Sequence, residues 1–125
     1  MEKEFVPYEQ ALELKVLGFN ELCVKEFHKC ILLTNSCGEE ATNSELIHLY
    51  GKEGTVIAAP LWQQAFKWFR EKHEVYGEIA TMDNFAPIYR AYTKDGEVNT
   101  YKVFSTYDEA QLECLKKLID IVKDE

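Results

Sequence analysis

The stretch Ala59-Pro60-Leu61-Trp62-Gln63-Gln64-Ala65-Phe66-Lys67-Trp68-Phe69-Arg70-Glu71-Lys72-His73 decides the fold of this chain. A helix that begins at Pro60 gives it an apolar face of Trp62, Ala65, Phe66, Phe69 and His73, with Leu61 and Trp68 on the flank. Buried apolar surface contributes about 25 cal/mol per Å², so its large rings are the chain's densest source of folding energy. We therefore expect this helix to lie on a sheet.

Length and composition indicate one soluble globular protein. The chain has 125 residues, of which 46% are hydrophobic, and a mean hydropathy of -0.31. This suits a single domain over residues 1–125 with a core of its own. No segment is long and apolar enough to cross a bilayer, and the acidic start Met1-Glu2-Lys3-Glu4-Phe5 lacks the features of a signal peptide. We expect a cytoplasmic protein with no membrane association.

The charge balance argues against general nucleic-acid binding. Asp and Glu number 22 against 14 Lys and Arg, which gives a net charge of -8. Nucleic-acid affinity depends on neutralising phosphates, so it requires the opposite balance. The acidic surface serves solubility or steers the protein toward basic partners.

The four cysteines, Cys23, Cys30, Cys37 and Cys114, are expected to be free thiols. Cytosolic proteins rarely hold disulfides, and no Cys-x-x-Cys pair is present to start a zinc site. We therefore predict buried small side chains, no metal and no cofactor.

The first half of the chain alternates helical and extended patterns. A helix is predicted over Pro7–Leu17, ended by Gly18 in a left-handed conformation with Phe19 folding back on Leu14. Leu22–Thr34 is predicted to be a single strand that enters a buried position.

The next segments are less decisive. The stretch 35–44 has the composition of a mobile surface loop, and Gly51–Gly54 that of a turn. Ser44–Tyr50 fits either a short helix capped by Ser44 or a strand, and its length leaves both open. Thr55–Ala58 is expected to be extended.

The second half indicates a β-meander followed by a helix. Strands are predicted at Val75–Thr81, Ala86–Thr93 and Val98–Phe104, with the Asp95-Gly96 pair in a hairpin turn. Thr106 and Glu109 then cap a final helix. Its buried face is expected to hold Leu112, Leu115, Leu118, Ile119 and Val122.

These patterns predict an α+β, two-layer fold. An antiparallel sheet, made of the three-strand meander and one or two earlier strands, is packed by about three helices. The apolar arc of the last helix is wide enough to need a second neighbour, either within the fold or in a homodimer.

No motif for catalysis is present. Gly-x-Ser-x-Gly, His-Glu-x-x-His and a Cys-His pair at a known spacing are all missing from the sequence. We therefore expect no enzyme, with a small hydrolase whose site is not recognisable as an alternative.

A ligand-binding hypothesis falls on the outer face of the central helix. Gln63, Lys67 and Arg70 are spaced to share that face, and Trp68 lies beside them. Cations can grip a phosphate or carboxylate while an aromatic ring stacks on a base. The plainer alternatives are a solvated face with intrahelical pairs such as Lys67 with Glu71, and Trp68 at the rim of the core.

Three segments together resemble a known group of proteins: Pro7-Tyr8-Glu9-Gln10-Ala11-Leu12-Glu13-Leu14-Lys15 with Leu17-Gly18-Phe19, the stretch Ala59 to Lys72 quoted above, and Thr106-Tyr107-Asp108-Glu109-Ala110 with Cys114-Leu115-Lys116-Lys117-Leu118-Ile119. The group comprises small, uncharacterised proteins of tailed phages, prophages and mobile elements of gut bacteria. The match covers about a third of the chain and not the region Leu22–Thr55.

The resemblance implies an accessory protein that acts in the cytosol of a bacterial host. It implies no active-site residues. Together with the absence of catalytic motifs from the sequence, the resemblance favours a non-enzymatic binding protein. Such a protein would counter host defence by occupying a host protein or by sequestering an anionic nucleotide signal. A phage replication or assembly protein is the alternative.

Overall fold

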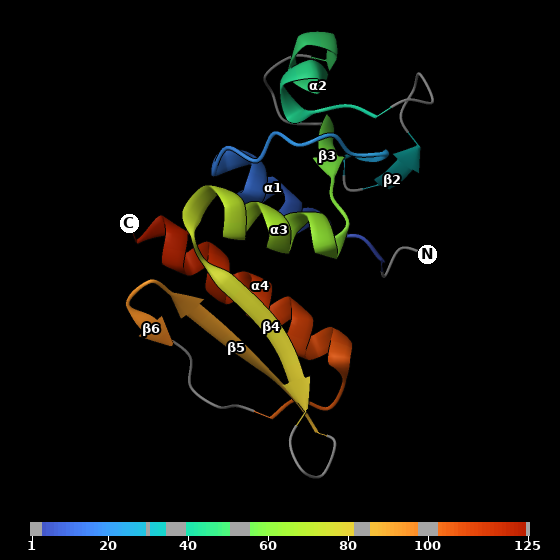
Figure 1. The fold of residues 1–125 in the computed structure, drawn as a ribbon. Coiled ribbons are helices and arrows are strands. Elements are labelled where there is room, and N and C mark those ends of the chain that lie inside the picture. Colours follow the sequence, from blue (N-terminus) through green and yellow to red (C-terminus); the bar gives the residue numbers. More distant parts are fainter. Residues whose placement is uncertain are drawn as a thin grey trace. The chain divides into compact units, whose positions relative to one another are not determined.

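The computed structural model describes residues 4–29, 31–34, 40–50, 56–81, 86–97 and 103–124. These residues form four helices and two antiparallel three-stranded sheets, which confirms the α+β prediction (Figure 1). The expectation that the early strands join the C-terminal meander in one sheet is wrong. The backbone groups into two compact units, Met1–Ala65 and Phe66–Glu125, each with its own sheet. The single domain remains a prediction.

The first unit holds a sheet between two helices. Its strand order is β2-β1-β3, with β1 at Lys25–His28, β2 at Ile31–Thr34 and β3 at Val56–Ala59. Successive strand residues face opposite sides of a sheet. Phe27 packs edge-on against Tyr8, the first residue of α1 (Tyr8–Val16), and His28 against Tyr50, the last of α2 (Asn43–Tyr50). The two helices thus cover opposite faces of this sheet (Figure 1).

The single strand predicted for Leu22–Thr34 is instead a hairpin. His28 pairs with Ile31 and Lys25 with Thr34, so β1 and β2 run antiparallel. The chain turns at Lys29, whose φ of 50° is left-handed. Glycine and asparagine are the usual residues for that conformation, and neither marks the turn in the sequence. The local sequence therefore did not indicate the turn between β1 and β2.

The first helix ends as predicted. Gly18 has a φ of 102°, its N–H donates to the Lys15 carbonyl at 3.0 Å, and the Phe19 N–H donates to the Leu14 carbonyl at 2.8 Å. This pair of bonds is the Schellman closure, which glycine permits because it lacks a Cβ. Phe19 and Leu14 are both buried.

The segment whose type the sequence left open is a helix, α2. Its cap is Thr42 rather than Ser44, because Thr42 and Glu45 exchange bonds. Thr42 Oγ1 accepts from the Glu45 N–H at 3.2 Å, and Glu45 Oε1 accepts from the Thr42 N–H at 3.1 Å. This reciprocal capping box fixes the start of a helix that is too short to be stable alone.

The central helix, α3, spans Trp62–His73. Its buried positions are Ala65, Phe66, Trp68 and Phe69, whereas Trp62 and His73 are half-buried. The buried face is therefore turned toward Trp68 relative to the prediction. Phe66 does meet a sheet, as expected, since its ring lies beside Gly77 of β4 (Tyr76–Thr81).

The second unit is a hairpin sheet with one long helix. β4 pairs with β5 (Pro87–Thr93), and β5 with β6 (Gly96–Glu97). The hairpin is confirmed, with Thr93 paired to Gly96, whose φ is 121°. Most of the third strand predicted at Val98–Phe104 lies outside the described residues, as do the first half of the predicted loop at 35–44, residues 35–39, and the turn at 51–54.

The last helix, α4, spans Tyr107–Lys123 and is capped by Thr106, whose Oγ1 accepts from the Glu109 N–H at 3.1 Å. Both features match the prediction. Its buried residues are Ala110, Cys114, Leu115, Leu118, Ile119 and Val122, so the predicted face is wrong only at Leu112, which is half-buried. The helix lies so close to β4 that a Cβ on Gly77 would be 2.8 Å from Cys114 Sγ and 2.9 Å from Leu118 Cδ1. Only a glycine fits between them without a shift.

Candidate functional site

The outer face of α3 presents the groups that the sequence singled out. Gln63, Lys67 and Arg70 are all exposed, as are the adjoining Glu71 and Lys72. Positions three and four residues apart lie one above the other on a helix, so Gln63, Lys67 and Arg70 form one stripe. We call these three residues the α3 stripe.

The cations of the α3 stripe lack carboxylate partners among the residues that the structure describes. Lys67 and Glu71 have the spacing of an intrahelical pair, yet no ion pair within 4.0 Å joins them. Arg70 likewise forms no ion pair in this part of the chain. The Lys67–Glu71 pair of the plainer alternative is therefore not formed, although the face is exposed as that alternative also expected.

Trp68 does not join the α3 stripe. It is 4% exposed, and its ring packs edge-on against Phe69 at 5.1 Å and against His73 at 4.8 Å between centroids. Its indole thus belongs to the core, which is the plainer of the two interpretations considered from the sequence. The α3 stripe offers charge and amide donors without a tryptophan face for stacking.

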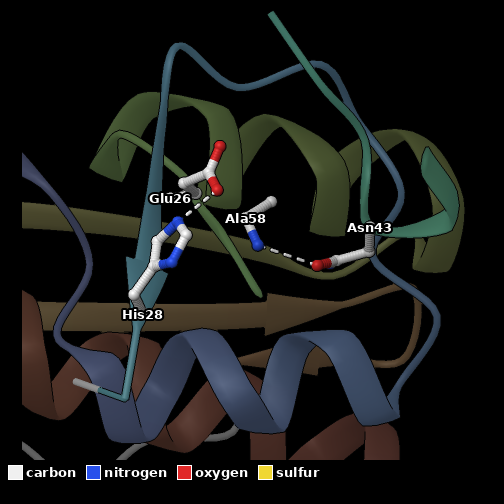
Figure 2. Close-up of polar contacts among 4 residues, drawn as sticks. All are labelled: Glu26, His28, Asn43 and Ala58. Carbon is white, nitrogen blue, oxygen red and sulfur yellow. Dashed lines mark hydrogen bonds and ion pairs between the residues drawn. The ribbon is translucent and has the colours of Figure 1, made fainter. Parts of the chain in front are cut away.

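A second polar cluster was missed by the sequence reasoning. Glu26, in the central strand of the first sheet, is 1% exposed, and its Oε2 lies 2.5 Å from Nε2 of His28. Figure 2 shows the carboxylate and the ring pointing toward one another along β1. Residues i and i+2 of a strand share a face, so the strand prediction itself placed the two side by side. Their pairing was open to inference, but the burial of Glu26 was not.

The contact with Glu26 fixes the orientation of the imidazole. His28 is 29% exposed and its ring also packs edge-on against Tyr50. A carboxylate that orients a histidine is a common element of acid–base sites. Within the described ranges, however, no hydroxyl or thiol forms a hydrogen bond with His28, and no group of three acidic, histidine or cysteine side chains could hold a metal. Two members of a catalytic set are thus present without a nucleophile beside them.

Two of the cysteines are inert by environment. Cys23 and Cys114 are buried free thiols, as predicted, and desolvation raises the pKa of each to about 12. Nearby carboxylates add to the rise of the Cys23 pKa. Because the thiolate is the nucleophile and metal ligand, neither residue is suited to catalysis. Cys30 and Cys37 lie outside the described residues.

Comparison of the chain with protein-family models, with curated proteins and with solved structures finds no match. Among the described helices, none has the length and apolar character to cross a membrane. The function is therefore argued from the residues of the chain.

Proposed function

We propose that this protein is a non-enzymatic accessory protein of a phage or related mobile element that acts in the host cytosol. It binds a small anionic ligand of the nucleotide type through the α3 stripe. By sequestering such a signal, it would weaken a host defence that depends on it. The phage setting rests on the sequence resemblance, and the ligand class on the chemistry of α3.

One observation carries the proposal: two cations with no ion pair to any described residue stand one turn apart on an exposed helix face of a protein whose net charge is -8. Arg70 can donate two parallel bonds to a phosphate, and Lys67 adds a compact positive charge beside it. Gln63 supplies an amide donor one turn earlier on the same stripe. The set suits phosphate groups better than it suits a base, because Trp68 is buried.

The test is ligand binding by the wild-type protein and by the variant Lys67→Gln/Arg70→Gln. Thermal shift and calorimetry with cyclic nucleotides and ADP-ribose-type ligands should show binding that the variant loses. The control for net charge is Lys116→Gln/Lys123→Gln, which removes two exposed cations from α4, where Lys116 pairs with Glu113 at 3.5 Å. Failure of every ligand to bind, or equal loss in both variants, would remove the proposal.

Occupation of a host protein is the other version of the binding function. It predicts a stable complex that co-purifies from host cells and is indifferent to nucleotides. If the Lys67→Gln/Arg70→Gln variant lost that complex, the α3 stripe would still be the binding surface, but its ligand would be a host protein and not a small molecule. Recovery of a large homo-oligomer alone would instead favour an assembly role.

The Glu26–His28 pair is the observation that favours a second candidate, a small hydrolase. The two functions separate by the state of the ligand after release from the protein. A sequestering protein returns the nucleotide intact, whereas a hydrolase returns it cleaved. Cleavage that disappears in His28→Gln would establish the second candidate.

A further inference from the structure

A cavity in the second unit lies apart from the α3 stripe. It has a volume of about 460 Å³ and is bordered by the end of α3, by the turn between β5 and β6, and by Ile121 of α4. This size is within the range of pockets that hold small molecules. Of its two aliphatic lining residues, Ile121 is half-buried and Val75 is only 1% exposed, so Ile121 supplies the accessible aliphatic surface.

The cavity rim carries charges of both signs. Glu74 and Asp95 supply two carboxylates and Lys94 an ammonium group, and all three are exposed. The turn that presents Lys94 and Asp95 is braced from within, because the Asp95 N–H donates to Thr93 Oγ1 at 3.1 Å. The rim can therefore meet a cationic and an anionic group at once.

Glu74 adopts a conformation that side chains disfavour. Its φ is 54°, directly after the end of α3, at a position where glycine is the usual residue. The next residue, Val75, donates its N–H to the Phe69 carbonyl at 3.2 Å, so the reversal closes the helix. Glycine would serve that purpose with less strain. Strained side chains of this kind concentrate at functional sites, and here the strained residue borders the cavity.

We propose that this cavity binds a small zwitterion of the free amino acid class. Glu74 and Asp95 receive the ammonium group, Lys94 receives the carboxylate, and the hydrocarbon part lies against Ile121. This site is independent of the nucleotide site proposed on α3. A ligand with only one of the two charged groups leaves part of the rim unpaired and binds more weakly.

The test is methyl NMR of the full chain with L-leucine, L-glutamine and L-lysine at millimolar concentration. At least one amino acid should shift the Val75 and Ile121 methyl signals in a saturable way. Butylamine and butyrate should bind at least about tenfold more weakly, because each meets only half of the rim. Absence of saturable shifts with every amino acid, or equal binding of butylamine, would overturn the proposal.

The variant Glu74→Gly gives the sharpest result. Glycine relieves the strain of the left-handed backbone, which offsets its extra conformational freedom in the unfolded chain, so the Tm should not fall. Amino acid binding should weaken at least about tenfold, because one of the two carboxylates is removed. Glu97→Gln changes an exposed carboxylate in β6 outside the cavity lining and should bind as the wild type does. Undiminished binding by Glu74→Gly would exclude the proposed role. Lys67→Gln/Arg70→Gln should retain amino acid binding whatever its effect on nucleotides.

Discussion

In the first sheet, Oε2 of Glu26 lies 2.5 Å from Nε2 of His28, and Glu26 is only 1% exposed. A polar group buried in this way is costly once its partner is removed, because water cannot replace the lost bond. The pair therefore restricts which residues β1 can tolerate.

The first prediction is a double-mutant cycle on this pair. His28→Leu should lower the free energy of unfolding by about 3 kcal/mol, because it leaves a buried carboxylate alone. Glu26→Leu should cost less, since the His28 ring can turn to water. The double variant should be more stable than His28→Leu, and urea unfolding of the four proteins measures the coupling. Strictly additive losses would show that the contact is not energetically important.

Asn43 provides the second prediction, because it ties two backbone segments together. Its Nδ2 donates to the Phe19 carbonyl and its Oδ1 accepts from the Ala58 N–H, both at 2.8 Å (Figure 2 shows the second bond). Asn43→Ala should cost about 2 kcal/mol, because the Ala58 N–H loses a buried acceptor and the Phe19 carbonyl loses a buried donor. Asn20→Ala is the control. It removes an exposed bond to the Ser44 N–H, which water can replace, and should cost less than about 1 kcal/mol.

Gly77 gives the third prediction, because α4 leaves no space for a side chain at that position. Gly77→Ala should destabilise the protein by about 1–3 kcal/mol through overpacking against Cys114 and Leu118. Adding Cys114→Ala should restore part of the loss, since it removes the sulfur that the new methyl group would meet. Thermal unfolding of the two variants measures this. Gly18→Ala is a contrast, because its cost comes from a φ of 102° with no atom nearby, so no side-chain truncation should rescue it.

The two buried thiols give the fourth prediction, which concerns alkaline pH. Folding raises the pKa of Cys23 and Cys114 from 9.0 to about 12. The unfolded chain therefore loses these protons first, and the stability that they contribute is complete below pH 9 and falls as the pH rises toward 12. The loss should approach about 1.4 kcal/mol per pH unit for each thiol.

The measurement is the difference in unfolding free energy between the wild type and Cys23→Ala/Cys114→Ala as a function of pH. Subtraction removes the contribution of other alkaline groups. A pH-independent difference would contradict the raised pKa values. Thiol reagents at pH 8 should also leave both cysteines unmodified in the native protein and modify them after unfolding.

The sequence by itself determined the features that depend on a few neighbouring residues. The closure at Gly18 and Phe19, the hairpin near Asp95 and Gly96, and the Thr106 cap were all predictable, because each is set by short-range bonds and allowed backbone angles. Helical periodicity also placed Lys67 and Arg70 on an exposed face.

Only the tertiary structure decided the features that depend on what packs over a residue. The turn at Lys29, the split into two sheets, the burial of Glu26 and the core position of Trp68 followed no local signal. Side chains distant in sequence supply the burial that stabilises a strained turn or a buried acid, and periodicity cannot identify those neighbours. The spacing of the aromatic residues predicted that α3 is a helix. Which of its rings are buried depended on the elements that pack against it.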